Sequence, residues 1–192
     1  QGWFANPSAS PHAPGRAAAK RVELAREQVA ALIGALPAQI VFTSGATEAD
    51  KLAVLGTARA LAPGRRHVIS ARTEHKAVLD AVRQLSREGF SVTWLQPDAD
   101  GRVSARTVAA ALRPDTALVS LMHVNNETGV IQDIQAIGEV CRAQSVVFHV
   151  DAVQSVGRLL LDLVRLPVDL LSLSANKIDG AKDVRVGFLR AA

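Results

Sequence analysis

The fold is decided by residues 117–150, ALVSLMHVNNETGVIQDIQAIGEVCRAQSVVFHV. Two apolar runs, 117–122 and 146–150, each have the length of one buried strand. Between them, over 134–143, apolar residues recur at the spacing of a helix. A strand, a helix and a second strand in this order predict a βαβ unit, in which the two strands are parallel.

The same alternation continues on both sides of this unit. We expect further strands at residues 39–43, 67–70, 90–95 and 169–173, and further helices at 15–34, 46–61, 74–88 and 104–112. Strands that alternate with helices predict a three-layer α/β/α domain, with a mostly parallel sheet and helices on both faces. We assign residues 1–13 to an irregular N-terminal arm and residues 14–192 to one large domain.

The composition indicates a globular chain with its own core. Of 192 residues, 48% are hydrophobic and 21% charged, which excludes an intrinsically disordered chain. No apolar run is long enough to span a membrane, and no signal-peptide pattern opens the sequence. Basic residues are scattered, so we expect neither a nucleic-acid nor a membrane partner. The chain has one cysteine, Cys141, which we expect to be a small residue of the core. A single cysteine predicts no metal site and is compatible with a reducing, cytoplasmic setting.

Polar residues gather directly after the predicted strands. Sheets of this class bind ligands beyond the carboxyl ends of their strands. The residues at those ends are Ser44–Thr47, Thr73–His75, Asn125–Glu127, Asp151 and Lys177. We therefore expect a binding site at this edge of the sheet.

Asp151 and Lys177 each follow an apolar strand and predict a specific cofactor. Pyridoxal phosphate (PLP) needs a lysine amine for a Schiff base and a carboxylate that keeps its pyridine nitrogen protonated. A buried unpaired carboxylate is costly, so Asp151 requires a cationic partner. The structural alternatives are a helix N-cap for Asp151 and an ordinary surface lysine for Lys177.

The other polar residues also have two interpretations each. The turn at Ser44–Thr47 could hold a phosphate at a helix start, or its hydroxyls could cap that helix. The ring of His75 could stack on a flat cofactor, or it could cap a helix or lie on the surface. The amides at Asn125 and Asn126 could contact a ligand or form a turn.

Together these stretches resemble the cysteine desulfurases, which are fold-type I PLP enzymes of the class V aminotransferase group. The matching stretches keep the family's order and spacing and cover nearly the whole chain: residues 6–8, 40–48, 73–79, 122–129, 149–157 and 172–177. The resemblance implies that Lys177 and His75 are the catalytic residues, with Lys177 as Schiff-base lysine and proton shuttle. His75 would also stack on the cofactor ring, and Asp151 would pair with the pyridine nitrogen. The further cofactor contacts would be Asn126 and Gln154 at the phenolate oxygen, and Ala46, Thr47, Ser174 and Asn176 around the phosphate.

The activity that this resemblance implies is a PLP-dependent cysteine desulfurase. Such an enzyme converts L-cysteine to L-alanine and passes the sulfur to an acceptor, here a sulfur-acceptor or iron–sulfur scaffold protein. The resemblance also implies a homodimer.

The chain departs from the family pattern at several positions. Asn176 stands where the family has histidine, Asp183 where it has glycine, and Lys51 where it often has asparagine. The family's C-terminal small domain, which carries the sulfur-accepting cysteine, is absent from this sequence. We therefore expect a truncated or incomplete form that binds PLP weakly and lacks full turnover. Two alternatives stay open: a non-catalytic PLP-fold relative that acts in assembly, and an enzyme like selenocysteine lyase.

Overall fold

A computed structural model describes residues 13–174 and the backbone of residues 185–189. The helices of this part are α1 (Ala13–Ile33), α2 (Ala46–Lys51), α3 (Thr57–Leu61), α4 (Lys76–Arg87), α5 (Ala105–Ala111) and α6 (Ile134–Ala143), with short turns η1 (Pro37–Gln39) and η2 (Leu52–Gly56). The strands are β1 (Ile40–Phe42), β2 (His67–Ala71), β3 (Ser91–Leu95), β4 (Thr116–Met122), β5 (Val147–Asp151), β6 (Leu170–Ser174) and β7 (Arg185–Leu189). Of the predicted N-terminal arm, only Ala13 is described, and it begins α1.

One mixed sheet organises the described residues. Its strand order is β1-β7-β6-β5-β4-β2-β3. The pairs from β3 through β2, β4 and β5 to β6 are all parallel, whereas β7 runs antiparallel to both β6 and β1. The predicted α/β fold with a mostly parallel sheet is confirmed, and the antiparallel strand β7 was not predicted.

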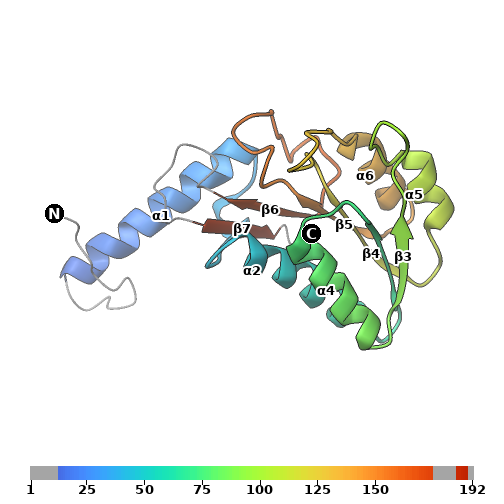
Figure 1. The fold of residues 1–192 in the computed structure, drawn as a ribbon. Helices are drawn as coiled ribbons and strands as arrows, with labels where there is room; N and C mark the ends of the chain where they lie inside the picture. Colours follow the sequence, from blue (N-terminus) through green and yellow to red (C-terminus); the bar gives the residue numbers. More distant parts are fainter. Residues whose placement is uncertain (1–12, 175–184, 190–192) are drawn as a thin grey trace.

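Helices cover both faces of the sheet, so the core has two halves (Figure 1). One half packs α1, α5 and α6 against the sheet and contains Ile33, Val108 and Ile137. The other half packs α3 and α4 against the opposite face and contains Ala58 and Val82. The predicted layers are therefore present.

Helix α1 differs from the other helices because it extends away from the sheet (Figure 1). Its buried residues are only Gly15, Ala30 and Ile33. Leu24 and Leu32 stay about half exposed. Only the C-terminal end of α1 thus belongs to the core.

The predicted helix over residues 46–61 is interrupted by a wider, π-helical turn. It forms as α2, the π-helical η2 and α3 in direct succession. Ala49 and Asp50 of α2 are buried directly before this turn, and Ala53 and Val54 are buried within it. Turns of this kind occur often at functional sites, and this one follows a buried charged residue.

Two buried histidines link neighbouring strands through side-chain hydrogen bonds. His149 in β5 lies between Ser120 in β4, at 2.8 Å, and Ser172 in β6, at 2.9 Å. His67 in β2 bonds in the same way to the hydroxyls of Thr93 and Thr116, both at 2.8 Å. Both rings are fully buried. Their polar atoms are satisfied inside the sheet, as buried polar groups require.

Cys141 confirms the sequence prediction of a core residue. It is fully buried in α6. Burial, and to a lesser extent the charge of Asp169, raise the pKa of its thiol to about 12. The thiol is therefore protonated and unreactive at neutral pH.

Candidate functional site

A cavity of about 210 Å³ opens beyond the carboxyl ends of the central strands. The residues that line it are Ala46, Asp50, His75, Met122, Asn126, Asp151, Val153 and Gln154. They come from the ends of β4 and β5, from the turns that follow these strands, from α2 and from the N-cap of α4. Sequence reasoning predicted five of these eight residues and the edge of the sheet on which they lie, but missed Asp50, Met122 and Val153.

Asp151 ends β5 and is 5% exposed. Its Oδ1 accepts a hydrogen bond from the backbone N–H of Val153 at 3.0 Å. Turns follow Asp151 instead of a helix, so the helix N-cap interpretation is wrong. Burial raises the pKa of Asp151, while the Val153 N–H and the nearby His75 offset part of this rise.

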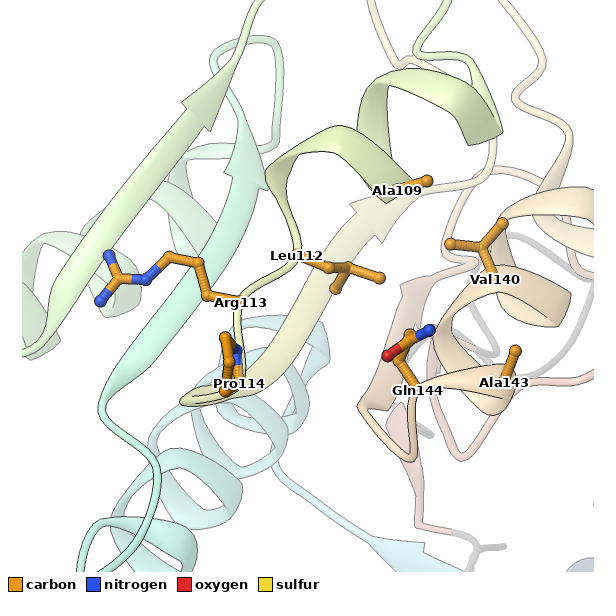
Figure 2. A pocket seen from close by; sticks show the side chains of 7 residues that line it. All are labelled: Ala109, Leu112, Arg113, Pro114, Val140, Ala143 and Gln144. Carbon is orange, nitrogen blue, oxygen red and sulfur yellow. The ribbon is translucent and has the colours of Figure 1, made fainter.

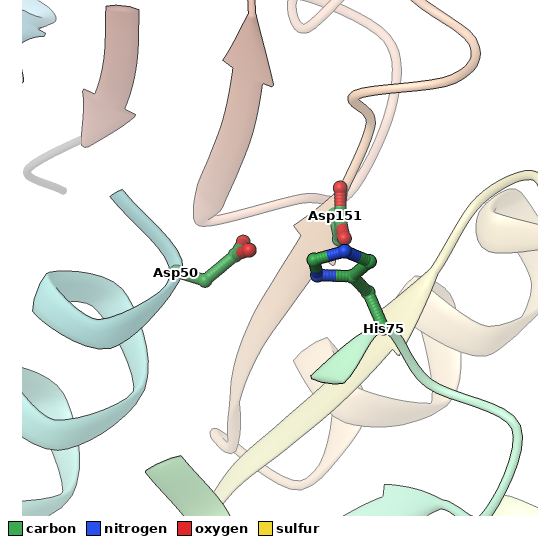
Figure 3. A group of neighbouring side chains, drawn as sticks. All are labelled: Asp50, His75 and Asp151. Carbon is green, nitrogen blue, oxygen red and sulfur yellow. The ribbon is translucent and has the colours of Figure 1, made fainter. Parts of the chain in front are cut away.

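His75 serves as a helix cap and also forms part of the cavity wall. Its Nδ1 accepts a hydrogen bond from the backbone N–H of Ala77 at 3.2 Å, at the start of α4. In a neutral ring the proton therefore lies on Nε2. The ring is exposed and stands beside Asp50 and Asp151, with the nearest polar atoms of the three side chains within 4.8 Å of one another (Figure 3).

Asp50 is the least expected member of the site. It is 1% exposed, and neither of its carboxylate oxygens has a hydrogen-bond partner at standard geometry among the described residues. Burial first, and then the charge of Asp151, raise the pKa of Asp50 well above its ordinary value, and the hydroxyl of Ser172 offsets a part. Figure 3 shows this carboxyl group pointing toward Asp151 and His75.

The nearest basic group to Asp50 carries no charge. Nε2 of His149 lies 3.8 Å from Asp50 Oδ1. Burial lowers the pKa of His149 to about 3, so the ring is neutral and the contact is no ion pair. Within residues 13–174, no lysine or arginine forms an ion pair with Asp50 or Asp151. The site thus holds buried carboxyl groups that have no lysine or arginine partner in the described part of the chain, and the basic side chain on its wall is His75.

One sequence signal could have revealed Asp50. Ala46, Ala49, Ala53 and Val54 recur at helical spacing, and Asp50 lies on the same side. An acid at such a position is buried against the sheet and needs a cationic partner.

The turn before α2 leaves its helix start without a side-chain cap. Gly45 is the N-cap residue, and neither Ser44 nor Thr47 caps the helix. The backbone N–H of Ser44 donates to the Glu48 carboxylate, which lowers the pKa of Glu48. Ala46 faces the cavity, whereas Thr47 is exposed and lines a separate hollow of about 500 Å³ on the outer side of α2 and α3.

The two neighbouring asparagines have different roles. Oδ1 of Asn125 accepts from the backbone N–H groups of Glu127 and Thr128, both at 2.9 Å, so Asn125 forms the turn. Its amide also donates to the carbonyl of Thr73 at 3.0 Å and ties the turn to the segment before His75. Asn126 is exposed and lines the cavity.

Of the other residues predicted to bind the cofactor, the structure describes Ser174 but not Asn176 or Lys177. Ser174 ends β6 and is 3% exposed, outside the set that lines the cavity. Asn176 and Lys177 lie outside the described residues, as do the stretch 6–8 and Asp183. Their predicted roles stay predictions.

A larger hollow of about 590 Å³ lies away from this site, between the C-terminal ends of α5 and α6 (Figure 2). It is lined mainly by Leu112, Pro114 and Val140. The side chain of Arg113 extends away from it and pairs with Asp115. Among the residues that the structure describes, no carboxylate or histidine lines this hollow, so they offer it no group for acid–base chemistry.

Residues 1–191 match the family model described as aminotransferase class V. The chain belongs to this family. Its sequence is 54% identical to that of the cysteine desulfurase IscS of Vibrio vulnificus (strain YJ016), over 98% of this chain and 47% of that protein. The chain spans about half the length of the curated relatives it matches.

Solved structures with a similar fold agree with this family assignment. One structure described as SspA in complex with cysteine has a TM-score of 0.93 at 42% identity, over 98% of this chain and 54% of that one. A structure described as a NifS-like protein has a TM-score of 0.94 at 36% identity, over 100% of this chain and 53% of that one. The predicted resemblance to cysteine desulfurases and the predicted fold are confirmed. No helix within the described residues is both long and apolar enough to cross a membrane.

A third buried acid of this site, Glu74, gives a prediction for pH dependence. Burial raises the pKa of Glu74 well above its ordinary value. The folded chain then binds this proton more tightly than the unfolded chain, so Glu74 costs stability as pH rises above about 4. We expect Glu74→Gln to gain stability relative to wild type between about pH 4 and 7, by at most about 1.4 kcal/mol per pH unit.

The measurement is urea unfolding of both chains across this pH range. The buried histidines are present in both chains and cancel in the difference. Asp80→Asn is the control of opposite sign, because hydrogen bonds from Lys76 and Arg83 lower the pKa of Asp80. A Glu74→Gln difference that does not change with pH would refute the prediction.

Proposed function

We propose that this chain binds PLP in the cavity between Asp50, His75 and Asp151 and takes part in the desulfuration of L-cysteine. One observation supports it most: buried carboxyl groups face a cavity at the carboxyl ends of the strands and have no lysine or arginine as a cationic partner within the described residues. The protonated pyridine nitrogen of PLP supplies such a cation, so the residues present fit this cofactor.

Most residues proposed to hold PLP surround the cavity. Asp151 would pair with the pyridine nitrogen, and His75 would lie against the ring. The proposed contacts to the phenolate oxygen are Asn126 and Gln154. Those to the phosphate are Ala46, Ser174, Asn176 and Thr47, of which Thr47 would contribute its backbone N–H because its side chain faces the outer hollow. The N–H groups at the uncapped start of α2 support the phosphate assignment, because helix starts favour anions.

Bound PLP supplies an electron sink that stabilises negative charge at the substrate Cα. The chain contributes the groups that orient the cofactor and move protons. Asp151 keeps a proton on the pyridine nitrogen. The Nε2–H of His75 is a donor at the mouth of the cavity, because its Nδ1 is engaged by Ala77. Lys177 is proposed to bind the cofactor covalently and to carry the substrate proton on Nζ.

The wider features of the activity belong to the same proposal. They comprise L-cysteine as substrate, an iron–sulfur scaffold or other sulfur acceptor as partner, a homodimer, and a cytoplasmic location. A relative solved in complex with cysteine supports the substrate. The assignment of residues 14–192 to one PLP-binding large domain is also proposed.

A PLP titration tests the function. Adding PLP to the chain should produce a visible absorbance band. Borohydride reduction should then fix the cofactor's mass on the peptide that contains Lys177. In Lys177→Ala the band and the mass label should both be lost. Lys51→Ala, which changes an exposed lysine of α2, is the control and should retain both.

The outcomes separate the proposal from nonspecific labelling. Aldehydes react with many surface lysines, so labelling spread over several peptides would contradict a dedicated site. Labelling at Lys177 followed by formation of alanine from added cysteine would support the full proposal. No band in the wild-type chain would overturn the cofactor assignment.

A further inference from the structure

We propose that Asp50 is a positioning residue of the PLP site, which acts through Asp151. When the pyridinium is bound, the Asp50 carboxylate would add a second negative charge beside Asp151, and so help to keep that nitrogen protonated. This inference rests on the proposed PLP function and adds a residue to it.

The geometry directs Asp50 into the site. The side chain is buried near the end of α2, directly before the π-helical turn, yet it lines the cavity. One of its carboxylate oxygens lies within 4.8 Å of a polar side-chain atom of Asp151 and of one of His75. Both carboxylate oxygens lack a hydrogen-bond partner in the described residues, which is rare for a buried polar group. An orphaned carboxylate that faces a cavity indicates a ligand with positive charge.

The groups around Asp50 do not neutralise it. Asp50 lies near two residues of β5, Asp151 and the neutral His149, and near the hydroxyl of Ser172 in β6. From the segment before α4 it meets His75 and the buried Glu74, one of whose oxygens also has no partner in the described part of the chain. Among the described residues of these elements, Asp50 therefore meets carboxyl groups and a neutral histidine, and no lysine or arginine pairs with it.

Two carboxylates should attract a bound cation more strongly than a single carboxylate does. A positive nitrogen beside Asp151 would lie near Asp50 as well, in a site that is largely shielded from water. Electrostatic attraction in such a site is stronger than in water. Removing the Asp50 charge should therefore weaken both the affinity for PLP and the hold on the pyridine proton.

The test compares Asp50→Asn with wild type, using the 192-residue chain loaded with PLP that carries ¹⁵N in its pyridine ring. The ¹⁵N chemical shift reports the proton on that nitrogen. In Asp50→Asn we expect the pH at which this proton is lost to fall by about one unit or more, and PLP to bind about tenfold more weakly. Asp100→Asn is the control: it makes the same chemical change on an exposed loop and should titrate like wild type.

The outcomes distinguish this inference from the proposed function. If wild type binds PLP and Asp50→Asn titrates like it, the inference is overturned and the PLP function stands. If wild type binds no PLP, the proposed function fails and this inference fails with it. Should Asp50→Asn not fold, as judged by circular dichroism, Asp50→Ser is measured in its place and the same shift is expected.

Discussion

Asp151→Asn is expected to weaken PLP binding about 100-fold. Asparagine keeps the shape of the side chain and can still accept the Val153 N–H. It removes the charge that pairs with the pyridine nitrogen, and that nitrogen then loses its proton at neutral pH. The cofactor would lose both its anchor and the protonated form that attracts electrons.

The measurement is a titration of the chain with PLP, followed by absorbance or tryptophan fluorescence. The loss should not come from unfolding, because replacing a buried carboxyl group whose pKa is raised removes a cost of folding at neutral pH. Urea unfolding of the PLP-free variant should therefore give a stability equal to or above that of wild type. An unchanged affinity for PLP would contradict the role of Asp151.

Gly138→Ala is expected to lower the free energy of unfolding by about 2 kcal/mol, as overpacking a core does. Gly138 lies in α6, and a Cβ there would stand 2.3 Å from the carbonyl oxygen and 2.7 Å from the Cγ of Pro167. The backbone carbonyl cannot move aside without shifting the entry into β6. At a solvent-exposed position of a helix, the same change would raise the free energy of unfolding by about 1 kcal/mol. A decrease therefore distinguishes the close contact with Pro167 from an exposed position.

Equilibrium unfolding in urea measures this effect. Gly64→Ala is the matched control, because a Cβ at Gly64 would meet nothing within 4 Å. We expect that variant to stay within about 0.5 kcal/mol of wild type. A Gly138→Ala chain as stable as wild type would show that α6 does not pack against Pro167 this closely.

Much of the fold could be predicted because its strands are short, apolar and buried. The runs that form β4 and β5 are recognisable without tertiary information, and so is the helix between them. Strand β7 could not be predicted in the same way, because its backbone pairs with β1 and β6 and a five-residue run does not reveal such distant partners. The π-helical turn η2 was missed because it shifts the helical register too locally for periodicity to resolve.

The site was predictable where a polar residue follows a strand. Asp151, His75 and Asn126 were found by this rule, since parallel strands bring their ends to one edge. Asp50 is not at a strand end, and only its contact with the site shows why an acid lies on the buried side of α2. Thr47 belongs to the predicted turn, but the turn directs it to the outer side. Position along the chain therefore located the edge of the sheet but did not fix the direction of each side chain.

The two histidine bridges have a consequence for how the site is held before any ligand arrives. His149 joins β4, β5 and β6, and His67 joins β2, β3 and β4, so the bridges share β4 and together connect all five parallel strands. Side chains alternate between the faces of a strand, so a slip of one residue would break both bonds of the affected histidine. The bridges thus pin the register of the strands that end at Met122 and Asp151. The binding edge is therefore preorganised by the sheet itself, and little of the energy of ligand binding is needed to align it.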